Sequence, residues 1–241
     1  MARPPGTAKE SSAAPHPRRR RGPHDGSVVS IDLATTLAVK MSPVDVHLSK
    51  PVEIMESDRN RAVATLTLAF AGDPVARWAY PAAQQYLTYW PRFIEAFGGR
   101  AFSHGTAHAL EGCLAVALWL PSGVGPDELA ISAVMDESLT GPIRHEVDDL
   151  FEQMGRFHPS AAHWYLPLTG VDPMAQGRGL GSGLLRHALA ICDRDRLPAY
   201  LEATSPRSRD LYERHGFRVL GTIEAGSSPP MWPMLRDPVS L

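Results

Sequence analysis

Cysteine is scarce in this sequence: the 241 residues include only Cys113 and Cys192. Both lie in apolar stretches without Cys-x-x-Cys spacing, so neither a disulfide framework nor a cysteine-based metal site is predicted. We expect two small buried thiols in a reducing compartment, and hence a cytoplasmic protein. The ten histidines are scattered, and no histidine follows His145-Glu146 at the metalloprotease spacing, so no metal is expected.

Long apolar runs are also missing. No stretch approaches the ~20 consecutive apolar residues that a membrane-spanning helix needs, so no membrane span is expected. A secretory signal is not expected either, because the four arginines that begin at Arg18 are followed by the polar segment 22–27.

The first part of the chain lacks the apolar residues of a core. Residues 1–29 are rich in Pro, Ser, Ala and Arg. We therefore predict a disordered extension over 1–45 and one domain over 46–241. Two other interpretations of the extension are a basic patch for nucleic acid and a gene start placed too early, with Met41 as the true initiator.

The formal net charge of −2 conceals an uneven distribution. Residues 1–50 contain eight basic and four acidic residues, and the rest of the chain contains 16 basic and 22 acidic ones. An acidic domain argues against nucleic acid as the main partner and suits a cationic amine.

One glycine-rich segment, within residues 171–185, is predicted to join a strand to a helix. The apolar run 164–171 leads into it, and apolar residues at helical spacing follow it, at Leu184, Leu185, Ala188, Leu189 and Cys192. The first turn of a helix has unpaired N–H groups and partial positive charge, and glycines let a phosphate approach those amides. The segment is thus predicted to hold a phosphorylated cofactor.

Two familiar phosphate loops fit this segment poorly. A P-loop needs a lysine after its last glycine, and no lysine lies near. The dinucleotide fingerprint would place a glycine where Ser182 stands. Glu202 could serve as its ribose-binding acid, but too little chain follows the segment for a Rossmann half.

The segment Gln176–Gly181 instead matches the pattern Gln/Arg-x-x-Gly-x-Gly/Ala in full. Here the sequence resembles the GNAT superfamily of acetyl-CoA-dependent N-acetyltransferases. A second motif agrees, because Tyr212 stands four residues before Gly216-Phe217, as in that family. Within the superfamily the chain is most similar to the puromycin acetyltransferase branch, over residues 70–78, 115–120 and 201–217.

The resemblance implies a site for acetyl-CoA as co-substrate. Gly170 and Val171 would offer backbone groups to the pantetheine arm, or would serve sheet pairing alone. Arg178 either pairs with a phosphate or points to solvent. Many family members have Asn where Ser205 stands, so one side-chain contact to pantetheine differs. The pyrophosphate would lie on the loop amides of Gln176, Gly177, Arg178, Gly179, Leu180, Gly181 and Ser182.

The resemblance also implies catalytic groups. Tyr212 would protonate the leaving thiolate, since a phenol with an ordinary pKa of about 10 is protonated at neutral pH; its other possible role is packing on the sheet. The strand residues themselves suggest a second group: the neighbours of Glu202 alternate between apolar and polar, so it is either a base for the incoming ammonium, acting directly or through water, or a solvated strand residue. Asp73, Trp78 and Tyr80 fall where the family's acceptor loop lies, and would either line an apolar acceptor site or belong to the core.

Periodicity and turn residues predict a mixed α/β order. The segment 75–80 is expected to be a loop, Asp58 to cap the first helix, and Pro233 to mark a sheet edge or a bulge. The resemblance implies a largely antiparallel sheet whose two central strands splay apart. Helices are expected around 59–70, 82–97, 143–157, 180–192 and 208–215, and strands around 52–55, in a hairpin over 101–120, and at 163–171, 200–203, 217–220 and 231–235.

The function implied is transfer of acetyl from acetyl-CoA to a primary amine of a small molecule, by direct attack without a covalent enzyme intermediate. The alternatives are a non-catalytic acetyl-CoA-binding module and a protein N-acetyltransferase. The protein would be a monomer or a homodimer.

Overall fold

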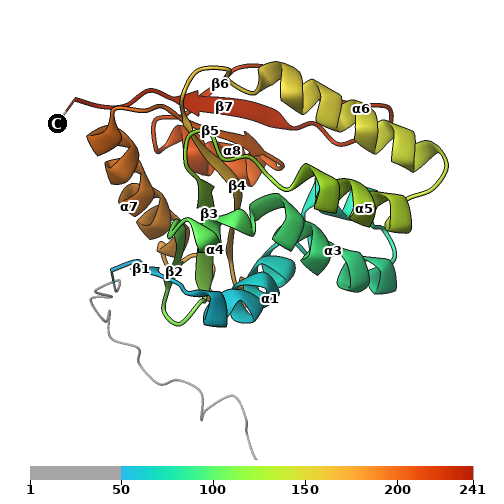
Figure 1. Cartoon of the computed structure of the whole chain (residues 1–241), viewed down its shortest axis with the longest axis horizontal. Coiled ribbons are helices and arrows are strands. Elements are labelled where there is room, and N and C mark those ends of the chain that lie inside the picture. The colour runs from blue at the N-terminus through green and yellow to red at the C-terminus, as the bar shows by residue number, and fades with distance from the viewer. Residues whose placement is uncertain (1–49, 241) are drawn as a thin grey trace, which may run out of the picture. The chain divides into compact units, whose positions relative to one another are not determined.

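A computed structural model describes residues 50–240, so the extension predicted over 1–45 lies outside the described residues. A seven-stranded sheet runs through this part of the chain (Figure 1). Neighbouring strands are antiparallel except β4 and β5. In sheet order the strands are β1 (Val52–Glu53), β2 (Ala107–Leu110), β3 (Ala115–Leu120), β4 (Trp164–Val171), β5 (Ala199–Ala203), β7 (Trp232–Arg236) and β6 (Arg218–Val219).

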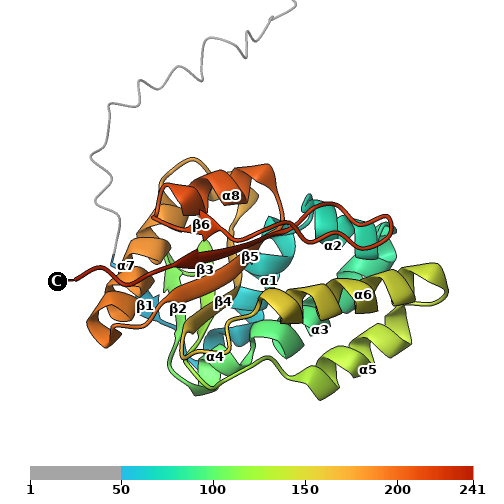
Figure 2. The same ribbon diagram turned by 90° about the horizontal axis from the view of Figure 1, so that it is seen from above.

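Helices cover both faces of the sheet, and this explains why β2 and β3 are apolar at nearly every position. One face packs against α7 (Leu180–Asp195) and α8 (Pro206–Glu213), around a core that includes Leu184 and Leu201. The opposite face packs against four further helices (Figure 2). These are α1 (Arg59–Ala69), α3 (Ala83–Gly98), α5 (Glu128–Ser138) and α6 (Pro142–Phe157). Within residues 50–240, none of the helices combines the length and the apolar character needed to cross a bilayer.

The predicted separation of two central strands is confirmed between β4 and β5. These parallel strands pair only at their beginnings, where Trp164 lies opposite Ala199 and Tyr165 opposite Tyr200. Beyond that point β4 continues to Val171 beside β3, while β5 continues beside β7. The facing edges of β4 and β5 are therefore not joined by a strand ladder, and a gap opens between them.

Three helices were not predicted, and two of them are short. Residues 74–79 form α2 (Pro74–Ala79) where a loop was expected, because the Asp73 carboxylate caps it by accepting from the N–H groups of Val75 and Ala76 at 3.0 Å. The chain continues past Gly98 into α4 (Arg100–Ser103) where the first strand of the hairpin was expected. Helix α5 is capped by Asp127, which accepts from the N–H of Ala130 at 3.1 Å.

Two smaller predictions were wrong. Asp58 precedes α1, but its carboxylate pairs with Arg61 at 3.3 Å instead of capping backbone N–H groups. Pro233 lies neither on an edge strand nor at a bulge, since β7 has a neighbour on each side. The carbonyl of Pro233 accepts from the N–H of Leu220, the residue that follows the two-residue strand β6. The N–H that proline lacks would face this same point, where the pairing of β6 with β7 has already ended.

Candidate active site

A cleft of about 660 Å³ lies where β4 and β5 separate. Its walls come from four places in the chain: the end of α1, the second half of β4, the glycine-rich loop with the first turn of α7, and β5 with α8. Nearly all the cofactor residues predicted from sequence line it, together with both predicted catalytic residues. The sequence motifs therefore meet in one place, although they lie up to some forty positions apart in the chain.

The glycine-rich loop is shaped by local hydrogen bonds and by left-handed residues. The Asp172 carboxylate accepts from the N–H of Met174 at 2.8 Å and begins a 3-10 turn, η2 (Pro173–Ala175). Gly177 and Gly179 then adopt φ angles of 78° and 80°, which residues with a side chain adopt at a cost. Gly179 is the N-cap of α7, so the unpaired N–H groups of the first helical turn lie along the cleft. This geometry suits the pyrophosphate of a nucleotide.

The polar side chains of the loop are held by the protein itself. Gln176 donates to the carbonyl of Val171 at 3.2 Å and accepts from Arg207 at 2.9 Å. Arg178 pairs with Glu111 at 2.7 Å, on the turn of the β2–β3 hairpin, and is not part of the cleft wall. From the sequence, Arg178 was expected either to pair with a phosphate or to point to solvent. The structure instead shows the ion pair with Glu111.

Two arginines that sequence analysis missed do line the cleft. Arg207 and Arg214 stand seven residues apart on α8 and at its end, which places them on one side of the helix. Their spacing was the only available signal, and nothing in the sequence showed which way that side faces. Among the described residues, they are the only lysine or arginine side chains in the cleft wall.

Three of the predicted cofactor residues also have structural roles: Gly170, Ser182 and Ser205. A Cβ atom on Gly170 would lie 2.6 Å from the Cβ of Ala69, so this glycine lets α1 pack closely on β4. The hydroxyl of Ser205 caps α8 by accepting from the N–H of Ser208 at 3.2 Å. The hydroxyl of Ser182 pairs with the imidazole of His215 at 3.0 Å and ties α7 to the end of α8. All three residues, and Val171 beside Gly170, also line the cleft.

Glu202 lies on β5 at the inner end of the cleft. The Tyr165 hydroxyl donates to Oε2 at 2.9 Å, while the buried Oε1 has no hydrogen-bond partner among residues 50–240. The Tyr200 hydroxyl is also buried near this carboxylate, and it too has no hydrogen-bond partner within the described residues. Burial raises the pKa of Glu202 to about 7, against the opposing effect of the Tyr165 hydrogen bond. A carboxylate with one free oxygen and a pKa near neutrality can accept a proton from a substrate.

Tyr212 lies on α8, across the cleft from β4. Its ring packs edge-to-face on Phe217, with centroids 5.8 Å apart, and only 7% of the residue is exposed. Burial, and then the negative charge of Asp73, raise the pKa of Tyr212 above its ordinary value. The phenol therefore keeps its proton at neutral pH and can act as a donor.

A second, smaller cavity of about 90 Å³ adjoins the inner end of the cleft. Asp73, Trp78 and Tyr80, the predicted acceptor residues, all line it. Five residues belong to the walls of both spaces, and they form the passage between them: Phe70, Asp73, Pro167, Glu202 and Thr204. No group of three or more His, Cys, Asp or Glu side chains within residues 50–240 is arranged to hold a metal ion.

Comparison with known proteins agrees with this geometry. Residues 125–217 match the Acetyltransferase (GNAT) family, a segment that includes the phosphate loop, Glu202 and Tyr212. An uncharacterised N-acetyltransferase of Schizosaccharomyces pombe is 35% identical over 78 residues, which are 31% of this chain and 32% of that protein. Mycothiol acetyltransferase of Beutenbergia cavernae is 45% identical over 62 residues, 24% of this chain and 21% of that protein. The matched segments thus cover a third or less of these two relatives.

Solved structures extend the likeness to most of the chain. A Corynebacterium glutamicum structure described as histone acetyltransferase HPA2 and related acetyltransferase is 26% identical, with a TM-score of 0.56. That match covers 80% of this chain and 97% of the other. Arylalkylamine N-acetyltransferase 2 of Aedes aegypti also has a TM-score of 0.56, over 78% of this chain and 98% of the other, but at 12% identity it shows similarity of fold alone.

Proposed function

The chain belongs to the GNAT superfamily of acetyltransferases, and from this premise we propose that it transfers acetyl from acetyl-CoA to the primary amine of a small molecule. The observation that carries the proposal is the passage between the two cavities. Glu202 stands in that passage with one free carboxylate oxygen, and Tyr212 lines the cleft on the cofactor side of it.

The cleft fits the co-substrate on three counts. The first turn of α7 offers N–H groups to a pyrophosphate, and Arg207 and Arg214 offer positive charge beside it. The edges of β4 and β5, which are not paired to each other beyond Tyr165, offer backbone groups to the amides of a pantetheine arm. Bound there, acetyl-CoA would supply an activated acyl thioester at the passage.

The residues of the passage would then move two protons. Glu202 accepts a proton from the incoming ammonium, so that the neutral amine attacks the thioester carbonyl directly. Backbone N–H groups along β4 stabilise the negative charge that develops on the carbonyl oxygen. Tyr212 donates its proton to the sulfur as the C–S bond breaks. Neither cysteine takes part: both are buried, and burial raises the pKa of each thiol.

A small acceptor is favoured over a protein because the cavity beyond Glu202 is lined almost wholly by apolar side chains from the interior of the fold. A protein substrate would need an open groove at this point. Names of fold neighbours are consistent with the proposal, since they include arylalkylamine and agmatine N-acetyltransferases. The finer resemblance to the puromycin acetyltransferase branch makes puromycin one acceptor to test.

The experiment is an acceptor screen. Purified protein is incubated with acetyl-CoA and a panel of primary amines that includes puromycin, peptides and a no-amine control, and both free CoA and acetylated product are measured. We expect product with at least one small amine. Binding of acetyl-CoA without any turnover would indicate a non-catalytic module, and acetylated peptides alone would indicate a protein acetyltransferase. Self-acetylation is easily recognised, because the only lysines are Lys9, Lys40 and Lys50.

A further inference from the structure

We propose that the cavity beyond Glu202, called here the acceptor chamber, selects a compact monoamine with an apolar body and excludes diamines and bulky amines. The inference rests on the proposed function and names the class of acceptor within it. Four observations support it: the composition of the chamber wall, the single free carboxylate oxygen at its mouth, the size of the chamber, and the contacts that link the helices around it.

The wall of the acceptor chamber is apolar except at its mouth. Side chains from α2, α3, α5 and α6 surround it, including Trp90, Phe93 and Leu150. The charged residues in its wall are Asp73 and Glu202, both of which also line the passage to the cofactor cleft. No lysine, arginine or histidine lines it within the described residues. The chamber is therefore complementary to a molecule with a cation at one end and an apolar body at the other.

The two carboxylates at the mouth are not equivalent. The Asp73 side chain is already engaged, with Oδ1 accepting from the N–H groups of Val75 and Ala76 and Oδ2 accepting from the Thr204 hydroxyl. Glu202 has one oxygen bonded to Tyr165 and one without a partner. One ammonium can thus be accommodated, at Glu202, where its proton would be removed. A second ammonium deeper in the chamber would be buried without an anion, which is costly.

The chamber also sets an upper limit on size. Its volume is about 90 Å³, smaller than the ~150 Å³ engineered cavity that accepts benzene. The chamber therefore suits a compact aliphatic body, whereas an indole ring or the body of puromycin exceeds it.

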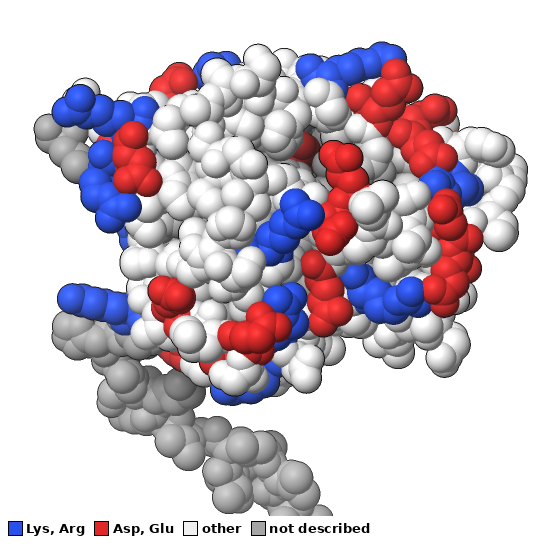
Figure 3. Space-filling view, viewed as in Figure 1, with Lys and Arg blue, Asp and Glu red and all other residues white. Residues whose placement is uncertain are grey.

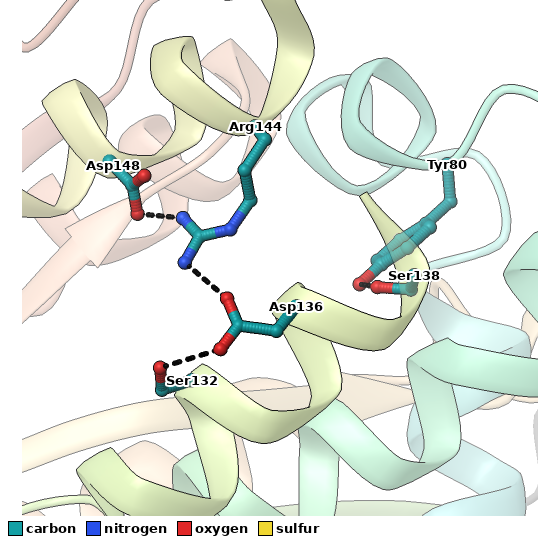
Figure 4. Close-up of polar contacts among 6 residues, drawn as sticks. All are labelled: Tyr80, Ser132, Asp136, Ser138, Arg144 and Asp148. Atoms are coloured by element: carbon teal, nitrogen blue, oxygen red, sulfur yellow. Dashed lines mark hydrogen bonds and ion pairs between the residues drawn. The ribbon is translucent and has the colours of Figure 1, made fainter. Parts of the chain in front are cut away.

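Polar contacts link the helices that surround the chamber. The Tyr80 hydroxyl and the Ser138 hydroxyl lie 2.8 Å apart and join the end of α2 to the end of α5 (Figure 4). Arg144 at the start of α6 donates to Asp136 on α5 at 2.8 Å and also pairs with Asp148 on α6 (Figure 4). These contacts join α2 to α5 and α5 to α6 around the chamber.

The test begins with amines that differ in one feature. We expect 3-methylbutylamine to have a kcat/KM at least about 100-fold above that of 1,5-diaminopentane, which has five carbons as well but a second ammonium, because a site discriminates strongly when a buried charge is left unpaired. Tryptamine and puromycin should be poor acceptors for reasons of size. Equal turnover of the monoamine and the diamine, or a preference for puromycin, would overturn the proposal.

A pair of variants tests the location. Leu150→Ala enlarges the chamber, so the kcat/KM ratio of tryptamine to 3-methylbutylamine should rise by about 10-fold or more. Leu189→Ala is the matched control, because Leu189 is an equally buried leucine on α7, in the core on the other face of the sheet. If Leu150→Ala fails to fold, Val147→Ala removes fewer atoms from the same wall. An unchanged ratio in the chamber variant, or the same change in both variants, would contradict the proposal.

Binding is measured separately from turnover. Trp78 and Trp90 line the chamber, so 3-methylbutylamine should change the intrinsic fluorescence in the presence of CoA, and 1,5-diaminopentane should not. If no amine is acetylated but this selective change occurs, the proposed function fails while the chamber assignment stands. If amines are acetylated without discrimination, the chamber assignment fails alone. If both selective turnover and a selective change in fluorescence are absent, the chamber assignment is refuted.

Discussion

At the scale of single residues, Glu202 carries the most consequential shift, since burial raises its pKa to about 7. A base must be deprotonated to act, so kcat/KM should rise with pH through about 7 and level off above it. Glu202→Gln should lower kcat/KM by roughly 10²–10⁴-fold and remove this limb of the pH profile. The measurement is the pH dependence of kcat/KM for wild type and variant, and a wild-type limb that persists in the variant would exclude Glu202 as the base.

The same shift has a consequence for stability. The pKa of Glu202 is higher in the folded state than the ordinary value of about 4.3 for an unfolded chain, so the folded state disfavours the charged form. The resulting destabilisation is absent below pH about 4, grows as pH rises, and is complete above pH about 7. The Tm of Glu202→Gln relative to wild type should therefore increase between pH 5 and pH 8.

Tyr212 could be predicted because it stands at a fixed offset from Gly216-Phe217, and Glu202 because it lies on a strand whose residues alternate between apolar and polar. Sequence analysis could not predict that Arg178 turns away, because the partner, Glu111, lies 67 residues earlier on a different turn. It also missed Arg207 and Arg214, since a helix with few apolar residues gives no sign of which side faces a cleft.

At the scale of elements, the phosphate loop makes a prediction about α7. Gly179 is the glycine that the motif singles out, but its φ of 80° means that any substitution would strain the backbone. Gly181 lies in the first turn of α7, and a Cβ atom there would meet its nearest neighbours at an ordinary 3.6 Å. Gly181→Asp should fold, because an acid is favourable in the first turn of a helix, yet lose most affinity for acetyl-CoA through repulsion of the pyrophosphate.

The control for this variant is Gly155→Asp, at an exposed position of α6 where an added Cβ has open space. Calorimetry should show affinity for acetyl-CoA close to wild type in Gly155→Asp and strongly reduced affinity in Gly181→Asp. Equal affinities in the two folded variants would show that the loop does not hold the phosphates.

Most long elements could be predicted because periodicity marks them. The helix of α6 repeats its apolar residues at helical spacing, and the continuous apolar run of β3 indicates a strand covered on both faces. Helices α2 and α4 were missed because they are only six and four residues long, too short for a period to show. The gap between β4 and β5 came from the family resemblance, since no local pattern states where two distant strands stop pairing.

At the scale of the whole molecule, the first property to consider is the distribution of charge on the surface. Acidic and basic side chains are interspersed on the face shown in Figure 3. Ion pairs of the described residues include Arg92–Glu137 and Arg144–Asp136. The surface seen there offers no extended area of one sign. In the proposed function, a cationic acceptor is recognised in the interior, at Glu202.

The separation of the domain from the first residues is also testable. If residues 1–40 are an extension without a part in the fold, their deletion should leave the Tm and the affinity for acetyl-CoA unchanged. Thermal unfolding and calorimetry of the deletion variant beside the full chain measure both. A large fall in either quantity would mean that the segment docks on the domain.

The central claim is that acetyl transfer takes place in the cleft between β4 and β5, with Tyr212 as the acid. Tyr212→Phe removes one hydroxyl and keeps the ring that packs on Phe217, so the fold should persist. The kcat for a genuine acceptor should fall by roughly 10²–10⁴-fold, while the KM for acetyl-CoA changes little, because the hydroxyl acts in the transition state. The direct measurement is kcat and KM of wild type and Tyr212→Phe with the same amine. A kcat near the wild-type value would show that Tyr212 is only a packing residue and would contradict the account.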